Sequence, residues 1–167
     1  MITTAWSNGE AAIDVSGNVF DDSDYDRQCA DIRSENAELL TEFSAWLADA
    51  GLSKTTIRGH RINLDFYLNH FLLRYNPLMR PPEGVDCVGE FLGDWFIYKA
   101  AWSSKTSIKA NAASLKKFYA FMAERGLIKP EELNALNQKI KEELPDWLDT
   151  LERWRNPESD PPDGWPF

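Results

Sequence analysis

The chain has 167 residues, enough for a single domain whose core folds without metal ions or disulfide bonds. Hydrophobic residues make up 43% of it and aromatic residues 13%, which excludes a wholly disordered chain. The formal net charge of −9 is unevenly spread: basic and acidic residues number 2 and 11 in residues 1–52, 11 and 6 in residues 53–126, and 5 and 10 in residues 127–167. A basic middle between acidic ends is typical of a polyanion-binding segment, although acidic ends also favour solubility.

Cysteine use and hydropathy give a first expectation about the compartment. Cys29 and Cys87 stand apart, without the close spacing of a metal or redox motif, and the chain does not begin with a basic-then-apolar signal. No stretch approaches the roughly 18 consecutive apolar residues of a membrane-spanning helix. The sequence therefore predicts a cytoplasmic protein without a membrane partner.

The first third of the chain divides into an arm and a helix. Residues 1–33 are rich in Asp, Ser, Asn and Gly and lack helical spacing, so we expect an irregular acidic arm. Residues 34–50 are predicted to form a helix, because apolar residues recur at intervals of three and four up to Gly51. These apolar residues are Leu40, Phe43, Trp46, Leu47 and Ala50.

The same spacing predicts further helices along the rest of the chain. A second helix runs from Ser53 until Asn76-Pro77 ends it, a third covers residues 86–102, and a fourth runs from Ser104 to the residue before Gly126. Pro130 suits the first turn of a fifth helix, and residues 145–154 predict a sixth. Residues 156–167 contain four prolines in twelve and are predicted to be an irregular tail.

An internal repeat organises the middle of the chain. The hexamer SKTTIR at residues 53–58 returns as SKTSIK at residues 104–109, and FSAWL at residues 43–47 matches LGDWF at residues 92–96. Each half therefore consists of a helix with a central Trp, a tight turn and a second helix. We predict an all-α fold in which residues 34–128 form a four-helix core of two αα-hairpins, with one or two additional helices in residues 129–155.

Each hexamer opens a helix, and a helix N-terminus presents unpaired backbone N–H groups with about half a positive charge. Hydroxyl groups and lysines at that position favour a phosphate, and longer polar side chains farther along each helix can extend into a groove of DNA. The candidate DNA-binding residues are Ser53, Lys54, Thr55, Thr56, Arg58, His60, Arg61, Ser104, Lys105, Thr106, Ser107, Lys109, Asn111 and Lys116.

A simpler interpretation of the hexamers stands beside this one. Ser and Thr are ordinary N-cap residues, each contributing about 1 kcal/mol, and lysines are common on solvated helix faces. The repetition of the hexamer and the positive balance of residues 53–126 favour the phosphate interpretation, but they leave the other open.

The stretch EFSAWLADAGLSKTTIRGHRINLDFYLNHFL, followed by WSSKTSIKANAASLKKFYAFMAERGLI, resembles the amino-terminal core-binding, SAM-like domain of phage integrases and other tyrosine recombinases. The shared pattern is an aromatic-rich helix, a Gly-Leu-Ser turn, a helix beginning with Thr-Ile, and a later helix that leads into Gly-Leu-Ile; it spans about residues 36–128. The resemblance implies a four-helix domain that clamps one side of DNA through the starts of its second and fourth helices.

Catalytic chemistry is not expected. Tyrosine recombinases cleave DNA with a separate domain that carries Arg, Lys, a His-x-x-Arg motif and a Tyr nucleophile, whereas the 167 − 128 = 39 residues after the match contain no His or Tyr. His60 and His70 lie ten residues apart, about 280° around a helix, so they cannot share a metal ion. No phosphate-binding glycine loop or other cofactor motif is present.

These observations lead to three functional hypotheses. The first is a non-catalytic domain that stands alone and binds double-stranded DNA through the two Ser-Lys-Thr helix N-termini. The second is a protein interaction module that keeps the recombinase-like fold but has lost DNA binding, and that meets a protein partner or a second copy through its acidic termini or the helices after Pro130. The third is an accessory or truncated recombinase that acts with a catalytic protein in trans.

Overall fold

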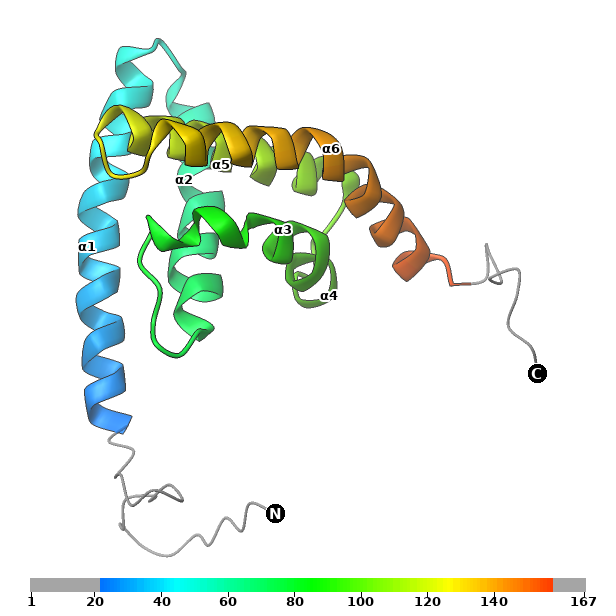
Figure 1. The fold of residues 1–167 in the computed structure, drawn as a ribbon, viewed down its shortest axis with the longest axis horizontal. Coiled ribbons are helices and arrows are strands. Elements are labelled where there is room, and N and C mark those ends of the chain that lie inside the picture. Colours follow the sequence, from blue (N-terminus) through cyan, green and yellow to red (C-terminus); the bar gives the residue numbers. More distant parts are fainter. Residues whose placement is uncertain (1–21, 158–167) are drawn as a thin grey trace, which may run out of the picture.

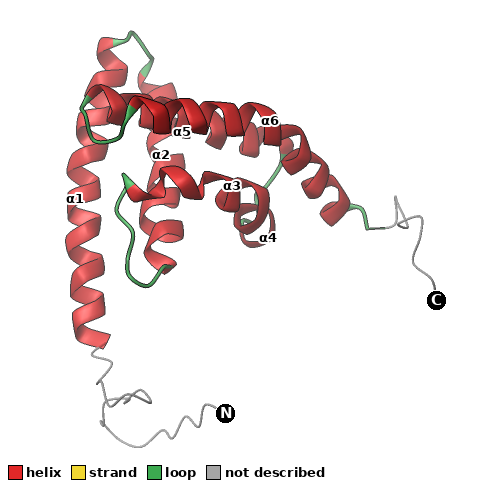
Figure 2. Ribbon diagram, in the orientation of Figure 1, coloured by secondary structure: helices red, strands yellow, loops and turns green. Residues whose placement is uncertain are grey.

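A computed structural model describes residues 22–157. Within this range every regular element is helical and no strand is present, as Figure 2 shows. The all-α prediction is therefore confirmed. Most of the predicted acidic arm (residues 1–21) and of the Pro-rich tail (residues 158–167) lies outside the described residues.

The first helix begins earlier than the sequence pattern indicated. Helix α1 spans Asp22–Asp49, so residues 22–33 of the expected arm are helical. Asp22 and Asp24 stabilise its first turn through the helix dipole. A small apolar cluster holds this extension against the end of the next helix: Cys29 and Ile32 bury themselves against Leu73. These contacts lie too far apart in the sequence to be recognised from local spacing.

Helix α2 spans Lys54–Phe66 and continues through a π-helical turn, Tyr67–Phe71, and a 3-10 turn, Leu72–Arg74. Its helical course therefore ends close to the predicted stop at Asn76-Pro77. In Figure 1, α1 and α2 run beside each other, and a turn containing Gly51 in the left-handed conformation (φ +87°) connects them.

The third helical region is a series of short segments and not one regular helix. A 3-10 turn, Glu83–Cys87, leads into α3 (Val88–Glu90), a π-helical turn (Phe91–Trp95) and α4 (Phe96–Lys99). Helix α5 then spans Lys105–Glu124, near its predicted bounds.

The last two predicted helices are a single helix, α6, which spans Pro130–Arg155 with Pro145 inside it. An interior proline costs about 3 kcal/mol. Trp147 and Leu151, which follow it, are buried on the same face as Ile140 before it. Burial of each large apolar side chain contributes about 1.5–3 kcal/mol, which is enough to carry the helix through the proline.

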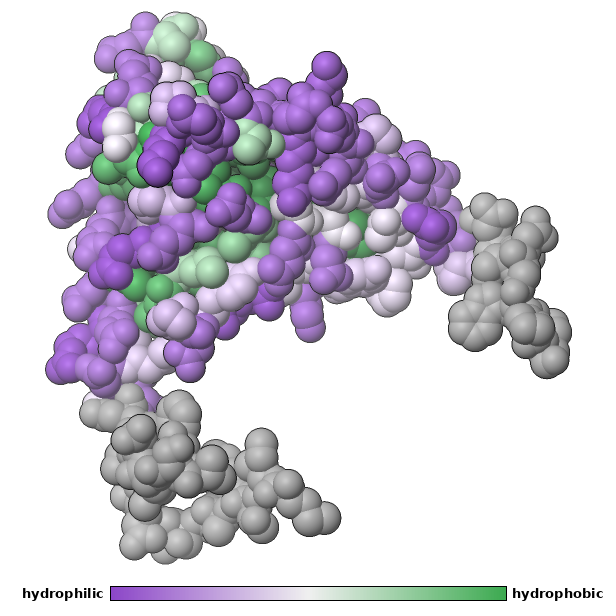
Figure 3. All heavy atoms as spheres, in the orientation of Figure 1, coloured by the Kyte–Doolittle hydropathy of each residue, from purple (hydrophilic) through white to green (hydrophobic). Residues whose placement is uncertain are grey.

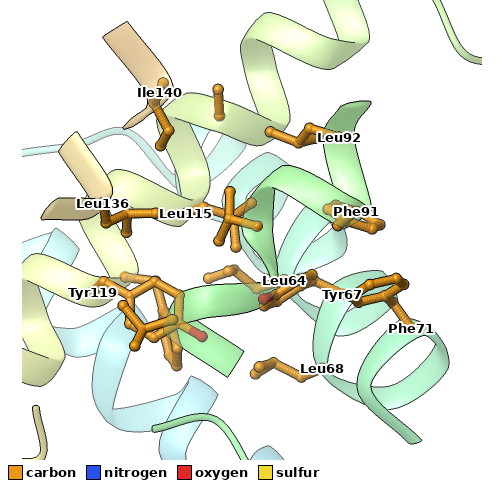
Figure 4. Close-up of a cluster of buried hydrophobic side chains, with 14 of the residues drawn as sticks. Leu64, Tyr67, Leu68, Phe71, Phe91, Leu92, Leu115, Tyr119, Leu136 and Ile140 are labelled. Carbon is orange, nitrogen blue, oxygen red and sulfur yellow. The ribbon is translucent and has the colours of Figure 1, made fainter. Parts of the chain in front are cut away.

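The core lies where α2, the segment 83–99, α5 and α6 meet. In Figure 4 the labelled side chains from these four elements point toward one another: Leu64, Tyr67, Leu68, Phe71, Phe91, Leu92, Leu115, Tyr119, Leu136 and Ile140. Residues 129–155 were expected as an addition to a core made by residues 34–128, but α6 contributes to the same core. The paired-hairpin arrangement stays a prediction, since α5 packs chiefly against α2 and α6.

Two buried tyrosines connect this core to the loop before residue 85. Tyr119 donates a hydrogen bond to the carbonyl of Pro81 at 2.8 Å, and Tyr67 donates one to the carbonyl of Gly84. Burial raises the pKa of both phenols well above its ordinary value, so both stay protonated as donors. The loop is thus held by the core that it covers.

Helix α6 crosses the segment 83–99 at two glycines. A β-carbon built on Gly93 would lie 2.6 Å from Cδ1 of Trp147, and one on Gly89 would lie 2.6 Å from Cε of Lys139. The two glycines are four residues apart, so both face the same side of their helical segment. Their lack of side chains lets α6 approach closely.

We expect Gly93→Ala to destabilise the protein by about 1–3 kcal/mol, because Trp147 or the α6 backbone must shift to admit the methyl group. Urea unfolding followed by circular dichroism measures this change. The matched control is Gly59→Ala in α2, where a β-carbon meets nothing within 4 Å and helix propensity should add about 0.5–1 kcal/mol of stability. Equal effects of the two substitutions would contradict the close approach.

Candidate nucleic-acid interface

The N-terminus of α2 is open to solvent. Ser53 is its N-cap, with extended backbone, and its Oγ accepts a hydrogen bond from the backbone N–H of Thr56 at 3.2 Å. The side chains of Ser53, Lys54, Thr55 and Thr56 are all exposed. The first hexamer therefore presents a helix terminus, a cation and hydroxyl groups together, as the sequence predicted.

The N-terminus of α5 is capped in a similar way. Ser104 Oγ accepts a hydrogen bond from the backbone N–H of Ser107 at 3.0 Å, and Ser107 Oγ accepts one from the backbone N–H of Ser104 at 2.7 Å. Because this reciprocal capping occupies both hydroxyls, Ser104 and Ser107 stabilise the helix start. Thr106 remains exposed.

The end of α6 covers this second terminus. Lys105 Nζ lies 2.8 Å from a carboxylate oxygen of Glu152, and Arg155 donates a hydrogen bond to the carbonyl of Ser103. The ion pair raises the pKa of Lys105 and lowers the pKa of Glu152. An anion from the chain itself thus already lies at the start of α5, whereas Lys54 at the start of α2 has no carboxylate partner among the described residues.

The N-termini of α2 and α5 do not form one shared site, because α5 crosses α2. Ser114 of α5 is the meeting point: His60 Nδ1 lies 2.8 Å from its Oγ, and Asn63 donates to it at 3.0 Å. Each terminus lies roughly 9–14 Å along its own helix from this crossing, given the rise of about 1.5 Å per residue. Figure 1 shows the two helices running in different directions.

His60, Arg61 and Asn111 were predicted to extend toward DNA, and the structure places all three partly or wholly inside. Asn111 is buried and donates to the carbonyl of Ser107 at 2.8 Å. Arg61 is half-buried, with Nη1 3.5 Å from Ser44 Oγ. His60 faces α5. The physical reason is that each helix packs on two sides, α2 against α1 and α5, and α5 against α2 and α6. Positions that a single apolar stripe would leave outside are therefore turned inward.

The hydroxyl of Ser114 links His60 to α5. It accepts a hydrogen bond from Asn63 at 3.0 Å, and its oxygen lies 2.8 Å from Nδ1 of His60 and 3.0 Å from the carbonyl oxygen of Ala110. Burial, followed by repulsion from nearby Lys117, lowers the pKa of His60 below its ordinary value.

Five exposed cations lie on α2 and α5, two on the first helix and three on the second. We call this set the basic face and define it by Lys54, Arg58, Lys109, Lys116 and Lys117. None of the five forms an ion pair among residues 22–157, whereas Arg74, Arg80, Lys105, Arg125 and Lys139 are each paired with a carboxylate. Asp65 is an exposed carboxylate on the same side of α2.

Sequence reasoning missed Lys117. It lies opposite the apolar stripe of α5, a position that indicated plain solvent exposure. Its electrostatic effect on His60 indicates that Lys117 lies on the part of α5 that is near α2. The neighbouring Lys116 was predicted, and the Lys-Lys pair was the available signal.

Other kinds of site find little support in residues 22–157. No group of three or more His, Cys, Asp and Glu side chains is placed to hold a metal ion, and no helix is long and apolar enough to cross a membrane. The face shown in Figure 3 is mostly hydrophilic. A shallow hollow of about 480 Å³ between α6 and the turn Glu83–Cys87 has walls of mixed charge, with Asp86 and Glu142 beside Lys139.

Comparison of the chain with protein-family models, curated proteins and solved structures finds no match. The resemblance of residues 36–128 to the core-binding domain of tyrosine recombinases therefore remains a prediction.

The depressed pKa of His60 gives a test of its buried role. The unfolded chain takes up a proton at this residue as the pH falls below about 6.5, whereas the folded protein resists it, so stability is lost in that direction. We expect His60→Asn, which keeps an N–H donor for Ser114, to lose less stability than the wild type between about pH 7 and pH 5.5. Urea unfolding at each pH measures the difference.

His70→Asn is the control, because it removes an exposed histidine and leaves His60 in place. It should keep the wild-type loss of stability. If the wild type and His60→Asn lose stability in parallel, the assignment of the pH effect to His60 is wrong.

Proposed function

We propose that this chain binds double-stranded DNA without cleaving it, through the basic face of α2 and α5. The observation that carries the proposal is the set of five exposed cations, Lys54, Arg58, Lys109, Lys116 and Lys117, which have no carboxylate partner among the described residues. Exposed cations without a carboxylate partner attract a polyanion. Their binding to it releases its counterions, which provides the driving force.

The contacts available on this face suit phosphates better than bases. Lysine provides a flexible point charge, and the α2 terminus adds backbone N–H groups and the hydroxyls of Ser53 and Thr55. Such contacts position a protein on DNA and carry no sequence information. Arg58 is the exposed side chain on this face with the geometry for a bidentate contact to guanine. The proposed binding is therefore weakly selective in sequence.

The resemblance to the core-binding domain of tyrosine recombinases supports DNA as the polyanion. It implies contacts at the starts of the second and fourth helices, and the open α2 terminus agrees with that expectation better than the covered α5 terminus does. The acidic residues of α1 and α6 make other approaches of DNA unfavourable, so they help to direct it to the basic face.

The proposal predicts a steep dependence of DNA affinity on salt. In a mobility-shift or fluorescence-anisotropy titration, each neutralised phosphate contributes a slope of about −0.9 to the plot of log K against log salt. We expect Lys109→Gln with Lys116→Gln to reduce the magnitude of that slope by about two and to weaken binding about tenfold for each lysine near 0.1 M salt.

The matched control is Lys141→Gln with Arg153→Gln, which removes two exposed cations of α6 that form no ion pair among the described residues. The overall charge changes equally in the two double variants. Equal losses of affinity would mean that net charge, and not the basic face, governs binding. Absence of binding to any duplex by the wild type at low salt would reject the proposal.

A protein interaction module is the second candidate, and one observation favours it. Tyr98 and Trp154 are both exposed and form an edge-to-face pair, with ring centroids 4.7 Å apart, where α4 meets the end of α6. Exposed aromatic side chains are enriched at protein interfaces. This surface involves α6, in keeping with the expectation that the region after Pro130 meets a partner.

A further inference from the structure

Trp102 is an exposed aromatic residue between the end of α2 and the start of α5. It lies in the turn between α4 and α5, and 59% of its surface is accessible to solvent. Large aromatic side chains are normally mostly buried, since they gain free energy from leaving water. An exposed tryptophan between two helices that carry cations is therefore a candidate for contact with a ligand.

The backbone around Trp102 is held firmly. Ser107 Oγ lies 3.3 Å from the carbonyl oxygen of Trp102 and 3.1 Å from that of Ser104, and Ser103 donates a hydrogen bond to the carbonyl of Ile97 at 3.1 Å. The ring makes angled contacts with Phe66 at 5.1 Å and with Phe96 at 6.4 Å between centroids. Neither contact is a parallel stack. The tryptophan is thus anchored while much of its surface remains free.

These contacts also locate Trp102 on the molecule. Phe66 ends α2, so Trp102 lies beside the end of α2 opposite to Ser53, roughly 18 Å away along the helix axis. Its carbonyl is bonded to the first turn of α5, the helix that carries Lys109 and Lys116. Trp102 therefore lies beside both helices that carry the basic face.

We propose that Trp102 stacks on an unpaired base, so that the basic face binds DNA in which a duplex continues into a single strand. The inference rests on the proposed function, because the cations must first hold the phosphates. Every base has an aromatic face, so stacking on tryptophan needs no particular sequence. The cations attract the backbone, and the ring distinguishes a base that has left the duplex from one that remains paired.

The internal repeat strengthens the assignment. At the offset of 51 residues that aligns the two hexamers, Trp102 takes the position of Gly51. Gly51 adopts a left-handed conformation that permits the turn into α2, whereas the turn into α5 carries an exposed indole instead. The aromatic ring is not required for a turn of this kind.

The experiment compares binding of three fluorescent DNA probes to the full chain at one salt concentration. The first is a blunt duplex, the second is the same duplex with a short thymidine overhang, and the third carries an overhang of the same length made of abasic sites. The last two have equal phosphate charge and differ in their bases. We expect the wild type to prefer the base-bearing overhang to the abasic one by about tenfold.

Trp102→Ala should abolish this preference while leaving affinity for the blunt duplex within about twofold. Trp102→Phe should retain part of the preference, because phenylalanine also stacks. Trp154→Ala is the matched control: Trp154 is 57% exposed but packs on Tyr98 at the end of α6, so its removal should leave the preference intact.

The outcomes separate this inference from the function on which it rests. Equal affinity of the wild type for the two overhangs, with salt-dependent binding of the blunt duplex, would overturn the role of Trp102 alone. Survival of the preference in Trp102→Ala would do the same. Failure of all three probes to bind at low salt would reject the DNA-binding proposal itself, and the exposed tryptophans would then belong to a protein interface.

Discussion

The close packing of α6 against Gly89 and Gly93 determines which surfaces of this molecule remain open. Because Trp147 lies directly over Gly93, α6 comes near enough to bury one side of α5, while α2 and α1 bury another. The cations of the basic face occupy positions of α2 and α5 that this packing leaves exposed.

Electrostatics then distinguishes the two ends of the repeat. Ser53 and Ser104 cap their helices in the same manner, but Glu152 neutralises the lysine beside Ser104 and nothing among the described residues neutralises the one beside Ser53. An exposed ion pair of this kind contributes at most about 1 kcal/mol, so its main effect is on charge distribution. The two copies of the repeat therefore share a serine N-cap but differ in the charge beside it.

Local signals in the sequence predicted the helix starts at Ser53 and Ser104 and the exposure of Lys109 and Lys116, because capping and amphipathic spacing depend on neighbouring residues. Features that depend on contacts between residues far apart in the sequence were not predicted. The extension of α1 requires Leu73, more than forty residues away, and the passage of α6 through Pro145 requires core positions on other elements. The burial of Asn111 was not predicted for the same reason. The one apolar stripe of α5 predicts a single buried side, whereas this helix is buried on two sides.

Gly51 precedes one end of α2 and Trp102 lies beside the other, so the two ends of the basic face differ in chemistry. A strand bound as proposed would meet the helix N-terminus of α2 at one end and the indole ring at the other, roughly 18 Å away. A nucleic-acid strand has chemically distinct 5′ and 3′ directions. The two possible alignments of such a strand would therefore be inequivalent, and the proposed binding would orient it without reading its bases.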